Sequence, residues 1–239
     1  MSLRDHKDTM TLSDAERLAG PLSFNLMIKP AGSLCNLGCS YCYYLDKAEI
    51  YSGREPVMSI DMLETVIRKY IETCETPEVT FNWHGGEPLV LGKDFFRKVL
   101  EFERRYADGK IIHNTMQTNG ILLDSEWAAI LRAGNFLTGI SVDGPAEIHD
   151  RFRRDRRGGP TLDKVLRGIA VLQEAGAEFN TMTTINKASE GKGALVYEFL
   201  KSIGSRYMQF MPVLEHVKDS RIVPPGTPDS ETAPWSVSA

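Results

Sequence analysis

The chain has 239 residues, of which 42% are hydrophobic and 25% charged, so it has the composition of a globular protein that can bury a sizeable core. Its formal net charge of -4 excludes a general attraction to phosphate backbones or anionic lipid, which disfavours a nucleic-acid partner. No apolar stretch approaches the roughly 20 residues that cross a bilayer, and the polar first residues lack a signal-peptide core. We therefore expect a cytoplasmic protein with no membrane partner.

Strands and helices are predicted to alternate along most of the chain, after a polar leader over residues 1–22. Apolar alternation predicts strands over residues 23–29, 78–83, 111–117, 136–142, 178–185 and 207–212. Helical spacing of apolar residues predicts helices from the N-cap Ser59 to Thr76 and over residues 93–106, 125–132, 162–175 and 193–203. Six strands, each but the last followed by a helix, predict an α/β fold: a partial (β/α)6 TIM-like barrel of parallel strands with outer helices over residues 23–216.

Three of the four cysteines, Cys35, Cys39 and Cys42, lie within eight residues directly after the first predicted strand. They do not resemble the dispersed pairs of a secreted disulfide framework, so metal binding is the leading interpretation. Iron-sulfur clusters are usually held by four cysteines, and three would leave one iron open to another ligand. The alternative is a structural zinc site with His84 or another distant group as the fourth ligand.

Further polar residues follow the predicted strands at their carboxyl ends, where parallel barrels carry catalytic groups. The second strand is followed by residues 83–88 (WHGGEP), whose glycines leave backbone groups accessible to a ligand. Asn119 closes the third strand and Ser141 the fourth. Turn chemistry alone would also explain these positions.

The most basic stretch of the chain is residues 151–157 (RFRRDRR). Clustered arginines can bind phosphate or an acidic peptide. The interpretation that we favour from the sequence is a solvated, mobile loop.

The CxxxCxxC spacing, with Tyr41 before the last cysteine, resembles the signature of radical S-adenosylmethionine enzymes. The resemblance implies a [4Fe-4S] cluster on Cys35, Cys39 and Cys42. It also implies that S-adenosylmethionine chelates the open iron and is cleaved by one electron to a 5′-deoxyadenosyl radical. The cofactor-binding residues that it implies are Tyr41, His84, Gly85, Gly86, Glu87, Asn119, Ser141 and Arg167.

Longer matches resemble anaerobic sulfatase-maturating enzymes, which oxidise a cysteine or serine of a sulfatase to Cα-formylglycine; they include LMIKPAGSLCNLGCSYCYYLDK, FNWHGGEPLV and GISVDGPAEIHDRFR. This resemblance implies that the radical takes a hydrogen atom from the substrate Cβ and that Tyr44 lies near the substrate. It also implies a sulfatase precursor or other peptide as partner and an electron donor such as ferredoxin or flavodoxin.

One feature departs from that family pattern. Family members carry a C-terminal domain with further cysteines that bind auxiliary clusters, whereas no cysteine follows Cys74 here. Residues 217–239 are rich in proline and small polar side chains, so we expect a linker or disordered tail, truncated before such a domain.

Two other functions remain open from the sequence. One is a radical enzyme that forms thioether or carbon-carbon crosslinks in a ribosomal peptide. The other is a non-catalytic zinc-binding module.

Overall fold

The computed structural model describes residues 11–13, 20–44, 57–219, 221–224 and 226–238. Most of the predicted polar leader therefore lies outside the described residues. Six parallel strands form one sheet in the order β1-β2-β3-β4-β5-β6, so each strand pairs with its neighbour in the sequence. Their bounds are Leu26–Ile28 (β1), Glu78–Trp83 (β2), Ile111–Thr118 (β3), Phe136–Ser141 (β4), Phe179–Ile185 (β5) and Met208–Pro212 (β6).

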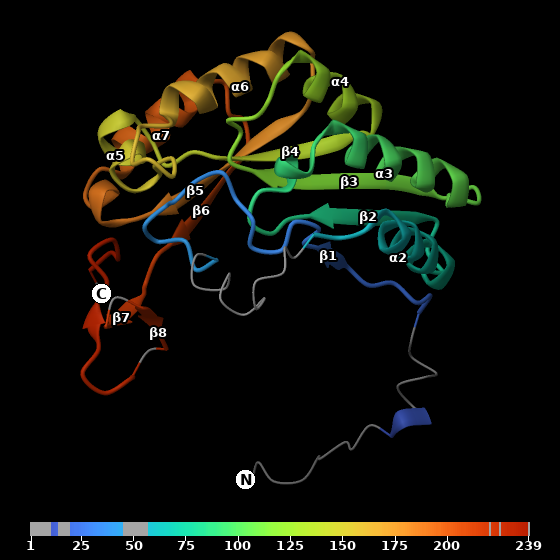
Figure 1. Cartoon of the computed structure of the whole chain (residues 1–239), viewed down its shortest axis with the longest axis horizontal. Coiled ribbons are helices and arrows are strands. Elements are labelled where there is room, and N and C mark those ends of the chain that lie inside the picture. The colour runs from blue at the N-terminus through green and yellow to red at the C-terminus, as the bar shows by residue number, and fades with distance from the viewer. Residues whose placement is uncertain (1–10, 14–19, 45–56, 220, 225, 239) are drawn as a thin grey trace, which may run out of the picture.

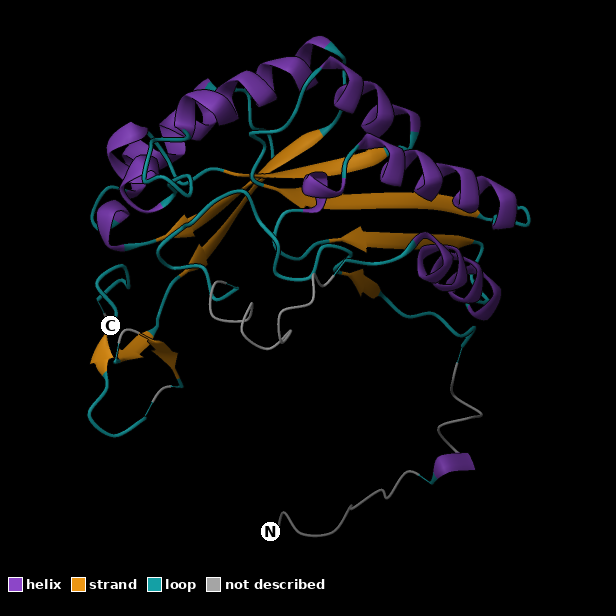
Figure 2. Cartoon of the chain, in the orientation of Figure 1, coloured by secondary structure: helices purple, strands orange, loops and turns teal. Residues whose placement is uncertain are grey.

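The sheet curls into a half-barrel with helices arranged around its outer face (Figures 1 and 2). The helices are α2 (Ile60–Thr73), α3 (Lys93–Tyr106), α4 (Ser125–Ala133), α5 (Ala146–Phe152), α6 (Leu162–Glu174) and α7 (Gly193–Ser202), with 3-10 turns η2 (Pro88–Leu91) and η3 (Lys187–Ser189). This arrangement confirms the predicted partial (β/α)6 barrel. No helix of the described residues is long and apolar enough to span a bilayer.

Local sequence signals account for where these helices begin and which face they bury. The Ser59 side chain accepts a hydrogen bond from the Met62 amide, which confirms Ser59 as the N-cap of α2. In the same way Asp124 accepts one from the Trp127 amide at the start of α4. α2 buries Leu63, Ile67, Tyr70 and Ile71 at helical spacing.

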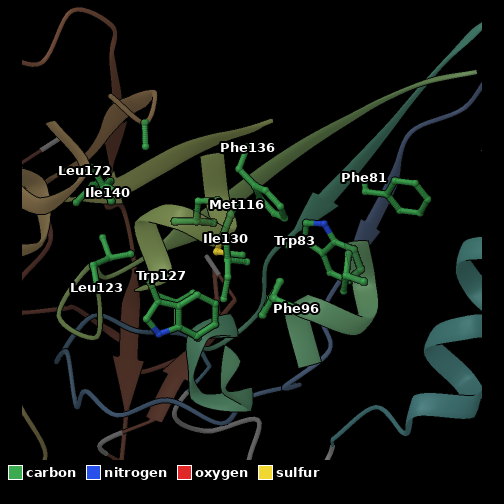
Figure 3. Close-up of a cluster of buried hydrophobic side chains, with 14 of the residues drawn as sticks. Phe81, Trp83, Phe96, Met116, Leu123, Trp127, Ile130, Phe136, Ile140 and Leu172 are labelled. Atoms are coloured by element: carbon green, nitrogen blue, oxygen red, sulfur yellow. The ribbon is translucent and has the colours of Figure 1, made fainter. Parts of the chain in front are cut away.

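Aromatic side chains fill the layer between the sheet and the outer helices (Figure 3). Phe96 of α3 lies edge-on to Trp83 of β2, with ring centroids 5.8 Å apart, and to Trp127 of α4 at 5.5 Å. The Trp83 indole donates a 2.7 Å hydrogen bond to Asn114 Oδ1, so its one polar atom is satisfied within the core. This layer fixes the strands whose carboxyl ends carry the candidate site.

The segment after β6 differs from the sequence-based prediction. β7 (His216–Lys218) pairs antiparallel with both β8 (Arg221–Val223) and β9 (Glu231–Thr232), so part of the predicted linker or tail forms a small sheet. Trp235 follows this sheet and packs against the apolar side chains of the loop after β1. The half-buried Trp235 side chain thus anchors this segment, which the mean polarity of residues 217–239 did not reveal.

Candidate active site

The cysteine loop, residues 30–44, follows β1 and crosses the carboxyl ends of the strands (Figure 1). Its first part is hydrogen-bonded to the GGEP loop, residues 84–88, which follows β2. The Gly86 amide donates to Gly32 O and the Glu87 amide donates to Leu34 O, both at 2.8 Å. A Cβ at Gly86 would lie 2.2 Å from Leu34 O, so only glycine allows this approach. The double glycine therefore has a structural reason that is independent of any ligand.

The second part of the cysteine loop is hydrogen-bonded to the arginine loop, residues 151–159. The Gly38 amide donates to Arg154 O at 2.9 Å, and the Ser40 amide donates to Phe152 O at 3.0 Å. Arg156 Nε donates to Cys35 O at 2.8 Å. The cysteine loop is thus held by two segments that follow different strands, β2 and β4.

The three thiols of the loop share one small, largely apolar environment. Cys39 packs with Leu37 and Tyr41, and Cys35 and Cys42 lie against this group. Burial raises the pKa of Cys35 to about 12 and that of Cys39 to about 11, and each of the two interacts electrostatically with the other loop thiols. No disulfide links the loop cysteines. Thiols gathered in a dry site become ligands when metal cations stabilise their thiolates.

The alternative of a zinc site requires a fourth ligand beside the three thiols. Within the described part of the chain, no three His, Cys, Asp or Glu side chains are grouped so that they could hold one ion. His84, the alternative fourth zinc ligand, instead accepts a 2.8 Å hydrogen bond at Nδ1 from the Gly85 amide. A polynuclear cluster spreads its cysteine ligands over several irons, and the loop with its three thiols fits that type of group.

Glu87 is fully buried, and its carboxylate accepts hydrogen bonds from other groups of the protein. Oε1 accepts hydrogen bonds from Leu89 N at 3.1 Å and Thr118 Oγ1 at 2.7 Å, and Oε2 accepts one from Asn119 N at 2.7 Å. Burial raises the pKa of Glu87 to about 7, although these three donors oppose the shift. The side chain joins the GGEP loop to the end of β3 and has no surface left for a ligand.

Asn119 and Ser141 lie where the sequence places them, at the carboxyl ends of β3 and β4. Asn119 Nδ2 donates to Asn36 Oδ1 at 2.8 Å and lies 3.8 Å from Cys35 Sγ, which brings Asn119 directly against the cysteine loop. Ser141 Oγ accepts a 3.0 Å hydrogen bond from Gln117 Nε2 of the neighbouring strand. Both side chains are polar groups at the mouth of the half-barrel.

Two other sequence-predicted residues occupy different surroundings. Arg167 is exposed on α6, and within the described residues no hydrogen bond or ion pair joins it to the cysteine loop. A role of Arg167 toward the cofactor therefore stays a prediction. Tyr44 is buried just beyond the last loop cysteine, with its ring 4.4 Å from that of Tyr43 and Lys29 Nζ 5.3 Å from its centroid.

A buried polar network below the cysteine loop was missed by the sequence reasoning. Tyr41 Oη donates to Asp143 Oδ2, and Arg153 Nε donates to Asp143 Oδ1 at 3.0 Å. Thr184 N at 3.0 Å and Asn186 Nδ2 at 3.4 Å also donate to this carboxylate. Tyr41 is thus buried and tied to the ends of β4 and β5, and its place near an adenine stays a prediction. One feature of the sequence could have indicated this network. Asp143 lies among apolar residues, which predicts that the aspartate is buried and therefore bound to another polar group.

Comparison with known proteins assigns this site to a family. The model of the Radical SAM superfamily matches residues 30–200, which include the whole set of loops described above. The chain belongs to the radical SAM superfamily. Membership implies a [4Fe-4S] cluster and S-adenosylmethionine as cofactors, and the three-thiol loop fits the cluster.

Individual relatives within the radical SAM superfamily are sulfatase-maturating enzymes. The chain is 42% identical over 193 residues to a serine-type anaerobic sulfatase-maturating enzyme of Bacteroides thetaiotaomicron, covering 80% of this chain and 47% of the relative. It is 36% identical over 204 residues to a cysteine-type enzyme of Clostridium novyi, covering 83% of this chain and 54% of the relative. The chain thus spans about half the length of these curated relatives.

Solved structures give the same picture of the fold. The structure described as native anSMEcpe with bound AdoMet and Cp18Cys peptide superposes with a TM-score of 0.74 at 32% identity, over 82% of this chain and 53% of that chain. Streptococcus suis SuiB superposes with a TM-score of 0.58 at 17% identity over 78% of this chain and 39% of that chain, a likeness of fold alone.

Proposed function

We propose that this chain is the radical-generating core of an anaerobic sulfatase-maturating enzyme, which oxidises a cysteine or serine of a sulfatase precursor to Cα-formylglycine. The observation that carries the proposal is the match to sulfatase-maturating enzymes of both types across the three-thiol loop and the loops that hold it. A cytoplasmic location belongs to the proposal, because a reducing compartment keeps the loop cysteines as thiols.

In this proposal each part of the site has a physical role. Cys35, Cys39 and Cys42 would hold a [4Fe-4S] cluster, which together with S-adenosylmethionine would supply the chemistry of a 5′-deoxyadenosyl radical. The polar groups at the strand ends, Asn119 and Ser141, orient the cofactor, and the GGEP loop presents its backbone groups. Tyr44 lies beyond the last cysteine, where it contacts the substrate.

The substrate oxidation removes two electrons in two steps. The bound cofactor would take a hydrogen atom from the substrate Cβ. A second electron would then leave to a one-electron acceptor of the iron-sulfur type and a proton to a base. Serine would yield the aldehyde directly, and cysteine a thioaldehyde that water would hydrolyse to the aldehyde with release of hydrogen sulfide. The auxiliary clusters of the family are the proposed acceptors, and no cysteine for them follows Cys74 in this chain.

The first test is anaerobic reconstitution of the cluster in the wild-type chain and in Cys39→Ala. We expect about four irons and four sulfides per wild-type chain, and formation of 5′-deoxyadenosine with dithionite. Cys39→Ala should lose both, with an unchanged circular dichroism spectrum, because Cys39 belongs to a loop outside the main core. Cys74→Ala is the matched control, since Cys74 is buried in the main core and should leave the iron content unchanged.

Three results would contradict the proposal. Stoichiometric zinc after anaerobic purification would support the zinc-binding module instead. Equal iron content in wild type and Cys39→Ala would remove the cluster from the cysteine loop. Crosslinking of a ribosomal peptide, without oxidation of a sulfatase peptide, would support the alternative radical enzyme.

A further inference from the structure

The arginine loop carries four exposed arginines, Arg151, Arg154, Arg156 and Arg157. Within the described residues none of the four forms an ion pair, whereas many basic side chains on α2 and α3 are paired with carboxylates. The loop is therefore a concentrated, uncompensated positive charge on a chain whose formal net charge is -4.

One acidic residue within this loop and one beside it stabilise its backbone conformation through hydrogen bonds. Asp155 Oδ1 accepts hydrogen bonds from the amides of Arg157 at 3.0 Å and Gly159 at 2.8 Å, and its Oδ2 lies 3.3 Å from Lys164 Nζ. Asp150 Oδ1 accepts from the amides of Thr161 at 2.7 Å and Leu162 at 3.0 Å at the start of α6. The carboxylates thus fix the backbone of the loop and leave the guanidinium groups outside.

The backbone of the arginine loop is directly bonded to the cysteine loop. Leu37 forms an antiparallel bridge with Asp155, next to the Gly38–Arg154 and Ser40–Phe152 hydrogen bonds. Arg156 Nε reaches the carbonyl of Cys35, a proposed cluster ligand. A protein that covers the exposed arginines would therefore lie against the segment that carries the thiols.

We propose that the arginine loop is the docking surface for an acidic one-electron carrier protein of the flavodoxin type. This inference rests on the proposed radical chemistry, in which the carrier loses one electron and the cluster gains it. Transient electron-transfer encounters use small interfaces, and opposite charges accelerate and orient them. Because the chain as a whole is negative, an acidic carrier is repelled elsewhere and attracted to this loop.

Direct binding tests the surface without any cluster. Oxidised flavodoxin is titrated into the cluster-free chain by isothermal calorimetry at low and high salt. The variant Arg151→Glu/Arg157→Glu is chosen because, in the described part of the chain, neither side chain forms a hydrogen bond or ion pair with the cysteine loop. We expect its Kd for flavodoxin to rise at least about tenfold at low salt, and the wild-type affinity to fall steeply as salt screens the charges.

The matched control reverses the same number of charges at another place. Arg132 at the end of α4 and Arg206 before β6 are both exposed and lie toward the amino ends of the strands, away from the cysteine loop. Arg132→Glu/Arg206→Glu should bind flavodoxin within about twofold of wild type, since it has the same net charge as the loop variant. Equal weakening of both variants would overturn the proposal in favour of a general charge effect.

A comparison of reductants then tests the function of the surface. In the reconstituted chain without peptide, the loop variant should form 5′-deoxyadenosine about as fast as wild type with dithionite, but at least about tenfold more slowly with reduced flavodoxin. An equal loss with both reductants would place the arginines at the cluster or cofactor and overturn the docking role. A raised KM for a sulfatase peptide with dithionite would assign the loop to the substrate.

The two proposals fail in different ways. If no cleavage occurs with either reductant in wild type, the proposed radical function fails, while flavodoxin binding to the cluster-free chain still decides the docking surface. If cleavage proceeds with both reductants at wild-type rates in the loop variant, the docking proposal alone is wrong.

Discussion

Asp143 connects the cysteine loop to the ends of two strands through a single carboxylate. It is fully buried, as is most of Arg153, and the guanidinium lies over the Tyr41 ring at 5.4 Å from its centroid. A buried ion pair of this kind is stable only while both partners and their hydrogen bonds are present. The position of Tyr41, between two cysteines, therefore depends on residues that are about 100 positions away along the chain.

Replacement of Asp143 by alanine should be strongly destabilising. The variant leaves the Arg153 guanidinium buried without its carboxylate, so we expect the free energy of unfolding to fall by about 3–5 kcal/mol in urea denaturation. Asp163→Ala is the control, because Asp163 is exposed in the first turn of α6. Its loss should stay below about 1 kcal/mol, and similar losses for the two variants would contradict the assigned role of the network.

At the level of single residues, features that depend on spacing along the sequence could be predicted, whereas contacts with distant parts of the chain could not. The three cysteines and the GGEP loop could be predicted because their chemistry depends on positions close together in the sequence. The partners of Asp143 could not, since Tyr41, Arg153 and Thr184 meet only after three separate strands are in place. The role of Arg167 stays a prediction, because helical periodicity alone does not say which face of α6 is turned toward the strand ends.

Among the elements, α3 places an acidic side chain on the face that is buried against the sheet. Glu103 faces β3 from α3 and is 4% exposed. Its Oε2 accepts a 3.0 Å hydrogen bond from Asn114 Nδ2, while Oε1 has no hydrogen-bond partner within the described structure. Burial raises the pKa of Glu103 to about 8, and Asn114 and Arg104 oppose the shift only in part. The native chain therefore favours the protonated acid.

This burial predicts a stability that falls as the pH rises. Between the ordinary glutamate pKa and about 8, the native state holds a proton that the unfolded state has lost, so unfolding becomes easier with increasing pH. The expected decrease is about 5 kcal/mol across this window, at about 1.4 kcal/mol per pH unit. Glu103→Gln stays neutral and should remove that part of the pH dependence in urea denaturation followed from about pH 5 to about pH 8.

The difference between the two pH profiles isolates Glu103, because Glu87 and His149 titrate in both proteins. Glu198→Gln, on the exposed face of α7, should keep the wild-type profile. Parallel profiles for wild type and Glu103→Gln would show that Glu103 is charged in the native state, contrary to the prediction.

The six strands could be predicted because buried parallel strands are short apolar runs separated by helical periodicity. α5 could not, since its seven residues follow an Asp-Gly-Pro turn and contribute only Ile148 and His149 to the interior. β8 and β9 also escaped prediction. They have three and two residues, respectively, and each is defined by its pairing with β7 more than by its own sequence.

For the whole molecule, the segment after β6 returns to the place where the chain first crosses the strand ends. Trp235 packs against the group formed by Leu37, Cys39 and Tyr41, and its indole donates a 2.8 Å hydrogen bond to Glu215 Oε2. The Trp235 carbonyl accepts another at 2.8 Å from the Lys187 amide beside η3. The last described residues thus help to cover the cysteine loop.

Removal of this indole should loosen the cysteine loop. We expect Trp235→Ala to lower the free energy of unfolding by about 2–4 kcal/mol and to speed hydrogen exchange of amides in residues 34–42. Hydrogen-deuterium exchange with mass spectrometry measures the local effect. Leu214→Ala is the control, because Leu214 is 59% exposed and its truncation creates no cavity. Unchanged exchange in the cysteine loop of Trp235→Ala would contradict the covering role.

The arrangement of partners around the cysteine loop also limits when this part of the molecule can mature during synthesis. Strands that pair with their sequence neighbours can join the sheet one after another as the ribosome releases them. The cysteines emerge early, but the GGEP loop and the arginine loop that hold them come later, and so does Asp143, which binds Tyr41. The cysteine loop can therefore reach its final position only after most of the barrel has been synthesised. Iron that arrives before that point would find cysteines whose loop is not yet held by its partners.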